Sequence, residues 1–293
     1  MKNKPIPKSE FILNEEGAIY HLRLKPGDIA TTIITVGDPD RVNAVTAHFD
    51  TIEIDVHHRE FKTVTGTYKG KRLTVISTGI GTDNIDIVFN ELDALVNIDF
   101  NSRTIKKNHT TLNFIRIGTS GGIQPNIPLN SFIVSETAIG LDNLLHFYHD
   151  TDFLDENFSE AFMNHMIWNE HKSSPYIVSA DPSLLELFDE PDFLRGITAT
   201  NVGFYGPQGR ILRLKLEDHR MNEKLQSFEY KHKKITNLEM ETSGIYGMAK
   251  LLGHRAISLN AILANRANGT FSGTAKKTID TLIEKVLNTM VSL

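Results

Sequence analysis

The sequence predicts a layered α/β fold. Short runs of β-branched residues, each followed by Gly, Asp or Asn, alternate with stretches whose apolar residues recur at helical spacing. Such alternation is typical of strands and helices that pack as layers. The chain has 293 residues, of which 40% are hydrophobic and 23% charged, so a substantial core is expected and a disordered or coiled-coil protein is excluded.

The predicted elements extend along the whole chain. Strands are predicted for residues 29–36, 73–77, 114–118, 132–134, 197–202 and 256–263. The clearest helices are predicted for residues 85–96 and 279–290, each with one apolar stripe. Two polar stretches, 100–113 and 153–175, interrupt this pattern, but strands resume after each. Residues 1–293 are therefore predicted to form a single domain with insertions.

Charge and composition limit the classes of partner. With 31 Lys and Arg against 36 Asp and Glu, the formal net charge is −5, which offers no attraction to nucleic acid or to an anionic membrane. The chain has no cysteine, which excludes disulfides and thiolate chemistry and favours the cytoplasm. It also shows neither a secretory signal nor an apolar run of membrane-spanning length.

Two glycine-containing segments follow the first two predicted strands. The segment Gly-Asp-Pro-Asp-Arg, from Gly37 to Arg41, places a main-chain N–H and a guanidinium at the carboxyl end of a strand, where ligands collect in α/β sheets. A type I turn is the alternative. Residues 77–84 open the next helix, and their amides can hold an anion. An N-cap at Asp83 or Asn84 is the simpler explanation.

Arg116 lies inside an otherwise apolar strand. A buried charge without a partner costs several kcal/mol, so an acidic group is expected to meet this guanidinium. A structural salt bridge to a core carboxylate is one interpretation. The Gly-Thr-Ser-Gly-Gly segment that follows at 118–122 supplies hydroxyl and N–H donors, which favours an anionic ligand instead.

Two further segments carry polar groups beside predicted strand ends. Glu239 and Glu241 come where a strand turns into a helix that runs to 252, with Gly253 as its terminating residue. These carboxylates can bind vicinal hydroxyls such as those of a ribose, or simply interact with the helix dipole. Gln208 and Arg210 lie on a Gly/Pro loop and match a flat heterocycle with carbonyl and imide edges, although a solvated surface loop is the alternative.

Together these motifs resemble the nucleoside phosphorylase family. The matching segments are Gly-Asp-Pro-Asp-Arg at 37–41, Ser-Thr-Gly-Ile-Gly at 77–81, Arg-Ile-Gly-Thr-Ser-Gly-Gly at 116–122, Glu-Met-Glu at 239–241, and Asn-Arg at 265–266. They occur in the family's order and approximate spacing over nearly the whole chain. The resemblance implies a single-domain, three-layer α/β/α sandwich with a central mixed β-sheet, and it is greatest to the members that act on uridine.

The resemblance also implies which residues bind each part of the substrates. Inorganic phosphate would be held by Gly37, Arg41, Arg116, Thr119 and, from a neighbouring subunit, Arg59. The ribose would be bound by Glu241, Met240, Glu239 and, from the adjacent subunit, His21. The base would be bound by Gln208 and Arg210, with Phe204 stacked on the ring and Arg266 supporting the loop.

The mechanism that the resemblance implies is phosphorolysis of a pyrimidine nucleoside. Cleavage makes the sugar cationic and the base anionic, so phosphate acts as nucleophile and counter-charge. Arg116, Gln208, Arg210 and Glu241 are the predicted catalytic residues, with Gln208 and Arg210 stabilising the departing uracil. Phosphate is a co-substrate and no other cofactor is expected.

Assembly and metal binding are predicted more coarsely. Because Arg59 and His21 would act in a neighbour's cavity, a homo-oligomer is expected, either a dimer or a hexamer. Some relatives bind a monovalent cation with a Glu matching Glu60 and a Ser. This chain has Asn84 at the latter position, which argues against a cation without excluding one. His146 and His149 have the spacing of a metal pair but lack a third ligand, so no metal site is predicted.

Three other functions remain open from the sequence. A hydrolytic nucleosidase would use water, but such relatives lack the phosphate arginines that Arg41 and Arg116 match. A purine or broad-specificity nucleoside phosphorylase is a second alternative, although purine-acting relatives have an Asp near the position of Asn265. A non-catalytic nucleoside-binding protein is the third, and the intact set of predicted site residues argues against it.

Overall fold

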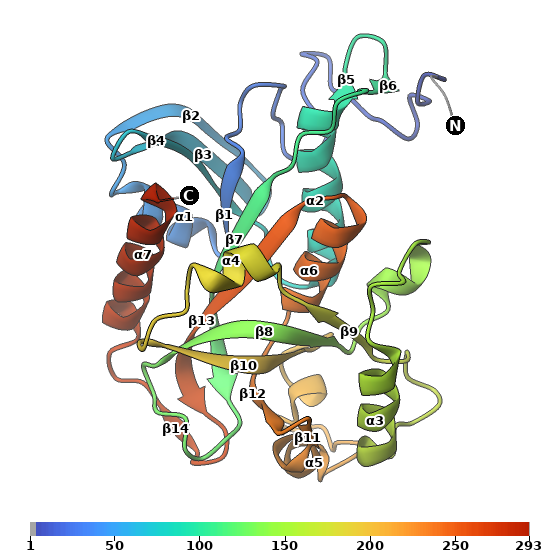
Figure 1. Ribbon diagram of the computed structural model, residues 1–293, viewed down its shortest axis with the longest axis vertical. Coiled ribbons are helices and arrows are strands. Elements are labelled where there is room, and N and C mark those ends of the chain that lie inside the picture. The colour runs from blue at the N-terminus through green and yellow to red at the C-terminus, as the bar shows by residue number, and fades with distance from the viewer. Residues whose placement is uncertain (1–3, 293) are drawn as a thin grey trace.

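The computed structural model describes residues 4–292 and has the expected mixture of strands and helices (Figure 1). The strands are β1 Thr32–Val36, β2 Thr51–His58, β3 Phe61–Tyr68, β4 Lys71–Ser77, β5 Ile98–Asp99, β6 Thr104–Ile105, β7 Asn113–Gly122, β8 Phe132–Gly140, β9 Tyr176–Ser179, β10 Phe193–Thr200, β11 Glu229–Tyr230, β12 Lys233–Glu239, β13 Arg255–Asn265 and β14 Thr270–Phe271. The α-helices are α1 Pro39–Thr46, α2 Thr82–Asn97, α3 Glu156–Met166, α4 Pro182–Glu186, α5 Met221–Ser227, α6 Thr242–Leu251 and α7 Ala275–Val291, and the 3-10 helices are η1 Leu144–Phe147 and η2 Gly206–Gln208.

The central sheet is mixed, as expected. Its strand order is β11-β12-β10-β8-β13-β7-β1-β4-β3-β2. Parallel pairs join β4, β1, β7 and β13 in turn, whereas β13 and β8 are antiparallel. The end of β12 also pairs antiparallel with the end of β7, through Asn237 opposite Gly122 and Leu238 opposite Gly121. The five strands β12, β10, β8, β13 and β7 therefore close into a ring.

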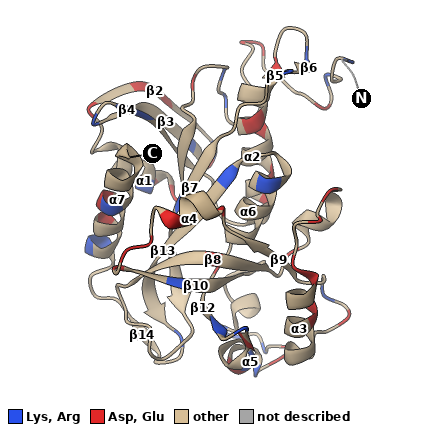
Figure 2. Ribbon diagram, viewed as in Figure 1, with Lys and Arg blue, Asp and Glu red and all other residues tan. Residues whose placement is uncertain are grey.

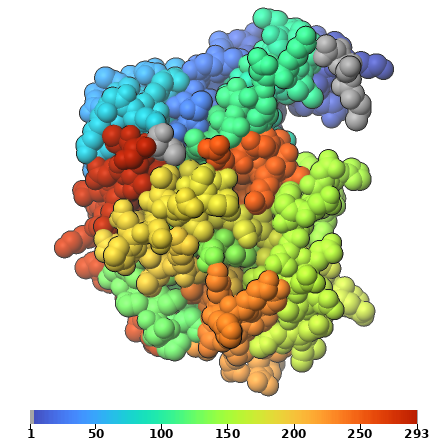
Figure 3. Space-filling model, in the orientation of Figure 1, coloured from blue at the N-terminus to red at the C-terminus, as the bar shows by residue number. Residues whose placement is uncertain are grey.

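Helices cover the sheet on both sides, which gives the three layers. Helices α2 and α6 pack against each other on one side of β1 and β7, and α1 and α7 lie on the other (Figure 1). The apolar stripe of α2 includes Ile85, Val88, Phe89 and Leu92, all fully buried. In the space-filling view the red helix α7 lies directly against the blue N-terminal third, where Tyr68 Oη donates to Asn288 Oδ1 at 3.0 Å (Figure 3).

Acidic and basic residues are interspersed over the fold and do not gather on one face of this view (Figure 2). Among residues 4–292, no helix is both long and apolar enough to cross a membrane.

The predicted strands and helices are confirmed, with changed limits. The strand expected at 114–118 continues to Gly122 because the Gly-Thr-Ser-Gly-Gly segment pairs with β13 and β12. The strand expected at 132–134 extends to Gly140, and the one expected at 197–202 runs from Phe193 to Thr200.

Both polar insertions contain structure that the sequence did not predict, and the first of them, 100–113, holds the short strand β6. Residues 153–175 contain α3, which Asp155 caps by accepting from the main-chain N of Phe158. Its apolar positions Phe158, Phe162 and Met166 are spaced four apart and are buried. The prediction of a plain polar stretch was therefore wrong here.

Candidate active site

A cavity of about 740 Å³ opens at the carboxyl ends of the central parallel strands. This is where open α/β sheets bind ligands. Its lining joins segments from distant parts of the chain, and it includes most of the residues that the sequence predicts for a site: Gly37, Arg41, Arg116, Thr119, Phe204, Gln208, Arg210, Glu239, Met240 and Glu241.

The first glycine segment starts a helix. Asp38 caps α1 by accepting from the main-chain N of Asp40, and Pro39 occupies the first helical turn, so the alternative of a simple turn is wrong. Arg41, in the first turn of α1, reaches the cavity, where its Nη1 donates to the main-chain O of Ile117 at 3.3 Å. Burial and the nearby Arg116 lower the pKa of Arg41, against the opposing effect of Asp38. Among residues 4–292, no carboxylate lies within ion-pair distance of its guanidinium, which suits an anionic ligand.

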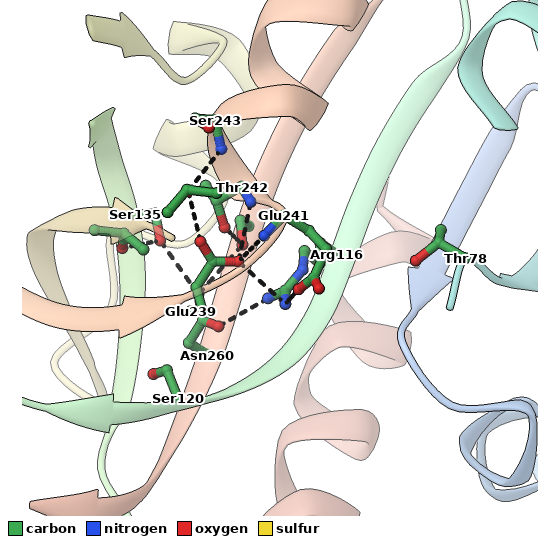
Figure 4. Close-up of polar contacts among 12 residues, drawn as sticks. Thr78, Arg116, Ser120, Ser135, Glu239, Glu241, Thr242, Ser243 and Asn260 are labelled. Carbon is green, nitrogen blue, oxygen red and sulfur yellow. Dashed lines mark hydrogen bonds and ion pairs between the residues drawn. The ribbon is translucent and has the colours of Figure 1, made fainter. Parts of the chain in front are cut away.

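Arg116 meets the acidic partners that the sequence predicts. Its Nη2 lies 2.5 Å from Glu241 Oε2 and 3.2 Å from Glu239 Oε2, and Nη1 donates to Asn260 Oδ1 at 2.8 Å (Figure 4). Burial lowers the pKa of Arg116, but the two carboxylates outweigh it, so the net shift is upward. The residue therefore forms a core ion pair and also lines the cavity.

The two carboxylates have different surroundings. Glu239 accepts from Thr200 Oγ1 at 2.6 Å through Oε1, and from the main-chain N of Glu241 and of Thr242 at 2.9 Å through Oε2. It therefore satisfies the first N–H groups of α6, where an anion interacts well with the helix dipole. Hydrogen bonds within the protein occupy both of its oxygens.

Glu241 faces the cavity from the N-cap position of α6, where its side chain makes no capping bond. Its Oε1 accepts from the main-chain N of Gly81 at 2.9 Å. Burial raises the pKa of Glu241, and Arg116 opposes that shift. Gly81 itself occupies the N-cap position of α2 without a side-chain capping bond there, so the expected cap by Asp83 or Asn84 is wrong.

In the loop after β10, the side chain of Arg210 stacks on the ring of Phe204. The guanidinium carbon of Arg210 lies 3.7 Å from the centroid of the Phe204 ring, and its Nη1 donates to Gln208 Oε1 at 2.6 Å. Burial, with the nearby Arg266, lowers the pKa of Arg210 to about 10. Arg266 donates to the main-chain O atoms of Gln208 and Gly209 at 3.1 and 3.3 Å, and these two bonds hold the loop.

Three predicted site residues lie outside the lining of this cavity: His21, Arg59 and Arg266. His21 binds Glu91 through Nδ1 at 2.6 Å, and its main-chain O lies 2.9 Å from Nδ1 of His58, the residue before Arg59. His21 therefore lies near the turn between β2 and β3 that contains Arg59, although the two segments are far apart in sequence.

Asn265 and the paired histidines have structural contacts. Asn265 is buried, and its side chain bonds four main-chain groups of the loops around it, those of Gln124, Ile127, Ala267 and Asn268. His146 Nε2 lies 2.8 Å from the main-chain O of Ser174.

Asp93, His109 and His254 approach one another as the ligands of a metal ion would. However, His254 Nδ1 accepts from the main-chain N of Leu112, so His254 Nε2 carries the hydrogen and cannot ligate a metal.

Several residues of the lining received no individual role from the sequence. They include Ile80, Ser120 and Phe271. Ser120 belongs to the Gly-Thr-Ser-Gly-Gly segment, so a signal was present. Phe271 had none, because it reaches the cavity only through the pairing of β14 with β13.

Known proteins resemble this chain over almost its full length. A uridine phosphorylase from Thermococcus kodakarensis is 30% identical over 274 residues, covering 90% of this chain and 83% of that relative. A purine nucleoside phosphorylase of the DeoD type from Chromobacterium violaceum is 29% identical over 249 residues, 83% of this chain and 84% of the relative. The crystal structure of a Trypanosoma brucei nucleoside phosphorylase, described as showing uridine phosphorylase activity, superposes with a TM-score of 0.87 at 28% identity and covers 97% of this chain and 100% of that one. The family model of the phosphorylase superfamily matches residues 31–291, and the chain belongs to that superfamily.

Proposed function

We propose that this protein is a pentosyltransferase that cleaves uridine with inorganic phosphate, giving uracil and ribose 1-phosphate. The observation that carries the proposal is that Arg41 and Arg116 line the same cavity as Glu241 and the Gln208–Arg210 pair. Two guanidiniums suit a phosphate dianion, a carboxylate suits sugar hydroxyls, and an amide beside a guanidinium suits a pyrimidine edge. The uridine phosphorylases among the similar proteins support the same substrate.

The geometry supports an in-line displacement at the anomeric carbon. Arg41 and Arg116, with Gly37 and Thr119, would hold phosphate so that one oxygen bonds to C1′ as the bond from C1′ to the base nitrogen breaks. The base leaves with the bonding electron pair and then takes a proton. Gln208 and Arg210 would stabilise its negative charge while it departs, and Phe204 would pack on its ring.

Glu241 would bind the ribose hydroxyls. Its Oε1 and Oε2 already accept from Gly81 and Arg116, so each oxygen has remaining lone pairs for a sugar hydroxyl. Met240, also in the lining, would pack beneath the sugar. Glu239 is proposed to support this site by holding α6 and Arg116, since its carboxylate accepts from Thr200 and from two main-chain N–H groups at the start of α6 and also pairs with Arg116.

A homo-oligomer, a dimer at least, would complete the site. Arg59 and His21 lie outside the cavity of their own protomer. The contact between His58 Nδ1 and the main-chain O of His21 nevertheless places them in one region of the protomer. One neighbouring subunit would then supply both, Arg59 to the phosphate and His21 to the ribose. Cytoplasmic location remains a prediction from composition.

A phosphate-dependence assay tests the proposed reaction. Uracil release from uridine is expected to require phosphate and to yield one ribose 1-phosphate per uracil. Arg116→Ala is expected to lose at least about 1000-fold in kcat/KM for phosphate, because it removes a charge-assisted ligand and leaves two buried carboxylates unpaired. Arg195→Ala, which changes an arginine outside the cavity lining, is the control. Undiminished uracil release without phosphate would refute phosphorolysis in favour of hydrolysis.

A purine substrate is the second candidate because purine nucleoside phosphorylases are among the similar proteins. Asn265 argues against it, since its side chain is buried in loop contacts and does not line the cavity. Uridine is therefore expected to exceed inosine in kcat/KM. A higher value for inosine would replace the pyrimidine assignment.

A further inference from the structure

A chain of buried polar side chains crosses the ring of five strands and ends at the cavity. Its interior members are all fully buried, and each comes from a different strand: Asn260 of β13, Ser135 of β8, Thr198 of β10 and Asn237 of β12. Arg116 and Ser120, both of β7, lie at its two ends (Figure 4). Both ends line the cavity, so the ring connects two points of one site through its interior.

The guanidinium decides the direction of the first hydrogen bonds. Arg116 can only donate, so the amide oxygen of Asn260 must face it, at 2.8 Å. The Nδ2 of Asn260 then donates to Ser135 Oγ at 3.2 Å. Thr198 Oγ1 uses its single hydrogen on Asn237 Oδ1, so in the bond between the two hydroxyls Ser135 Oγ must donate to Thr198 Oγ1, 2.6 Å away.

The same direction continues to the other end of the chain. Thr198 Oγ1 donates to Asn237 Oδ1 at 2.9 Å, and Asn237 Nδ2 donates to Ser120 Oγ at 3.0 Å. Ser120 therefore accepts at the end of an aligned series of bonds, and such alignment polarises each member. Among residues 4–292, its own hydrogen finds no acceptor, and the side chain borders the cavity.

We propose that Ser120 Oγ donates a hydrogen bond to a carbonyl oxygen of the bound base, and that Asn260, Ser135, Thr198 and Asn237 are positioning residues for this donor. This inference rests on the proposed function. The base side is indicated by the next residue, Gly121, where an added Cβ would lie 3.5 Å from Arg266 Cγ. Arg266 in turn holds the main chain of Gln208. The bond strengthens as the base becomes anionic, so it favours the transition state over the ground state.

The test compares Ser120→Ala with a matched control. The Ser120 variant is expected to lower kcat/KM for uridine about five- to tenfold, the effect of one lost hydrogen bond, while the KM for phosphate changes less than about twofold. Ser159→Ala is the control because Ser159 has the same 9% exposure, makes one hydrogen bond to a main-chain oxygen and lies outside the cavity lining. Its kinetics are expected to match those of the unchanged protein.

Ser135→Ala tests the positioning role, because Ser135 does not line the cavity. It is expected to lower kcat/KM for uridine about threefold, and to have almost no further effect once Ser120 is already Ala, since it acts through that hydroxyl. A melting temperature for each variant separates loss of folding from loss of the donor.

Two results would overturn the inference: a Ser120→Ala protein with kcat/KM for uridine within about twofold of the unchanged protein, or additive effects of the two substitutions. Failure of the proposed function is a separate outcome. It would appear as a lack of phosphate-dependent uracil release by the unchanged protein, whereas the inference concerns only the ratio between variant and unchanged protein.

Discussion

Replacing Gly118 with Ala is the sharpest test of how Arg116 is held. A Cβ at this position would lie 1.7 Å from Arg116 Nη1, 2.5 Å from its Cζ and 2.7 Å from Asn260 Oδ1. Contacts between heavy atoms are favourable only at about 3.5–4 Å, so the guanidinium would have to move by about 2 Å. It cannot move that far and keep its 2.5 and 2.8 Å bonds to Glu241 and Asn260.

The displacement separates a buried ion pair, which costs about 3–5 kcal/mol. Gly118→Ala is therefore expected to lower the free energy of unfolding by roughly that amount and kcat/KM for phosphate by about 100- to 1000-fold. Urea denaturation and initial-rate kinetics at saturating uridine measure the two effects.

Gly122→Ala is the matched control on the same strand. Its added Cβ would meet Ile262 Cγ2 at 3.4 Å, an ordinary contact, so both quantities are expected to change little. The double variant Gly118→Ala with Arg116→Lys shortens the side chain and is expected to regain stability without regaining activity. If Gly118→Ala keeps kcat/KM within about threefold, the guanidinium is not held as described.

The other predictions concern the loop, a carboxylate and metals. Arg266→Ala is expected to raise the KM for uridine about tenfold and leave the KM for phosphate unchanged, because it frees the Gln208 main chain; steady-state kinetics that show equal effects on both would contradict this. Burial raises the pKa of Glu241, so kcat/KM for uridine is expected to fall on acidification at a pH above the ordinary Glu value of 4.5, as that carboxylate takes up a proton; a pH profile of Glu241→Gln should lack this limb. Treatment with EDTA is expected to leave the rate unchanged, and a loss restored by added metal would show that a metal is needed.

The phosphate side of the candidate site was predictable because its residues lie in short segments next to strand ends. A charged residue such as Arg116 inside an apolar strand indicates a partner, and a glycine segment after a strand indicates a ligand-binding edge. These are local rules. For Arg41 and Glu241 the local rules leave a simpler alternative open, and their predicted roles come from the family resemblance.

The edge hairpin β2–β3 was missed for the opposite reason. The predicted strands are continuous apolar runs, which are typical of strands buried on both faces. β2 alternates polar residues with Ile52, Ile54 and Val56, and most of it is exposed. Antiparallel edge strands often have this pattern, so the period of two was the signal to use.

The sequence alone established the layered fold, the order of its main strands and helices and the chemical type of each site residue, because local spacing and burial determine these properties. Tertiary structure decided which groups meet. Arg116 contacts Glu241, which is 125 residues away along the sequence, and Asn260, which is 144 residues away. These groups meet because β12 closes onto β7. The closure places side chains from five strands in one interior, where every polar group needs a partner. No local pattern specifies that closure, and the orientation of Ser120 depends on it.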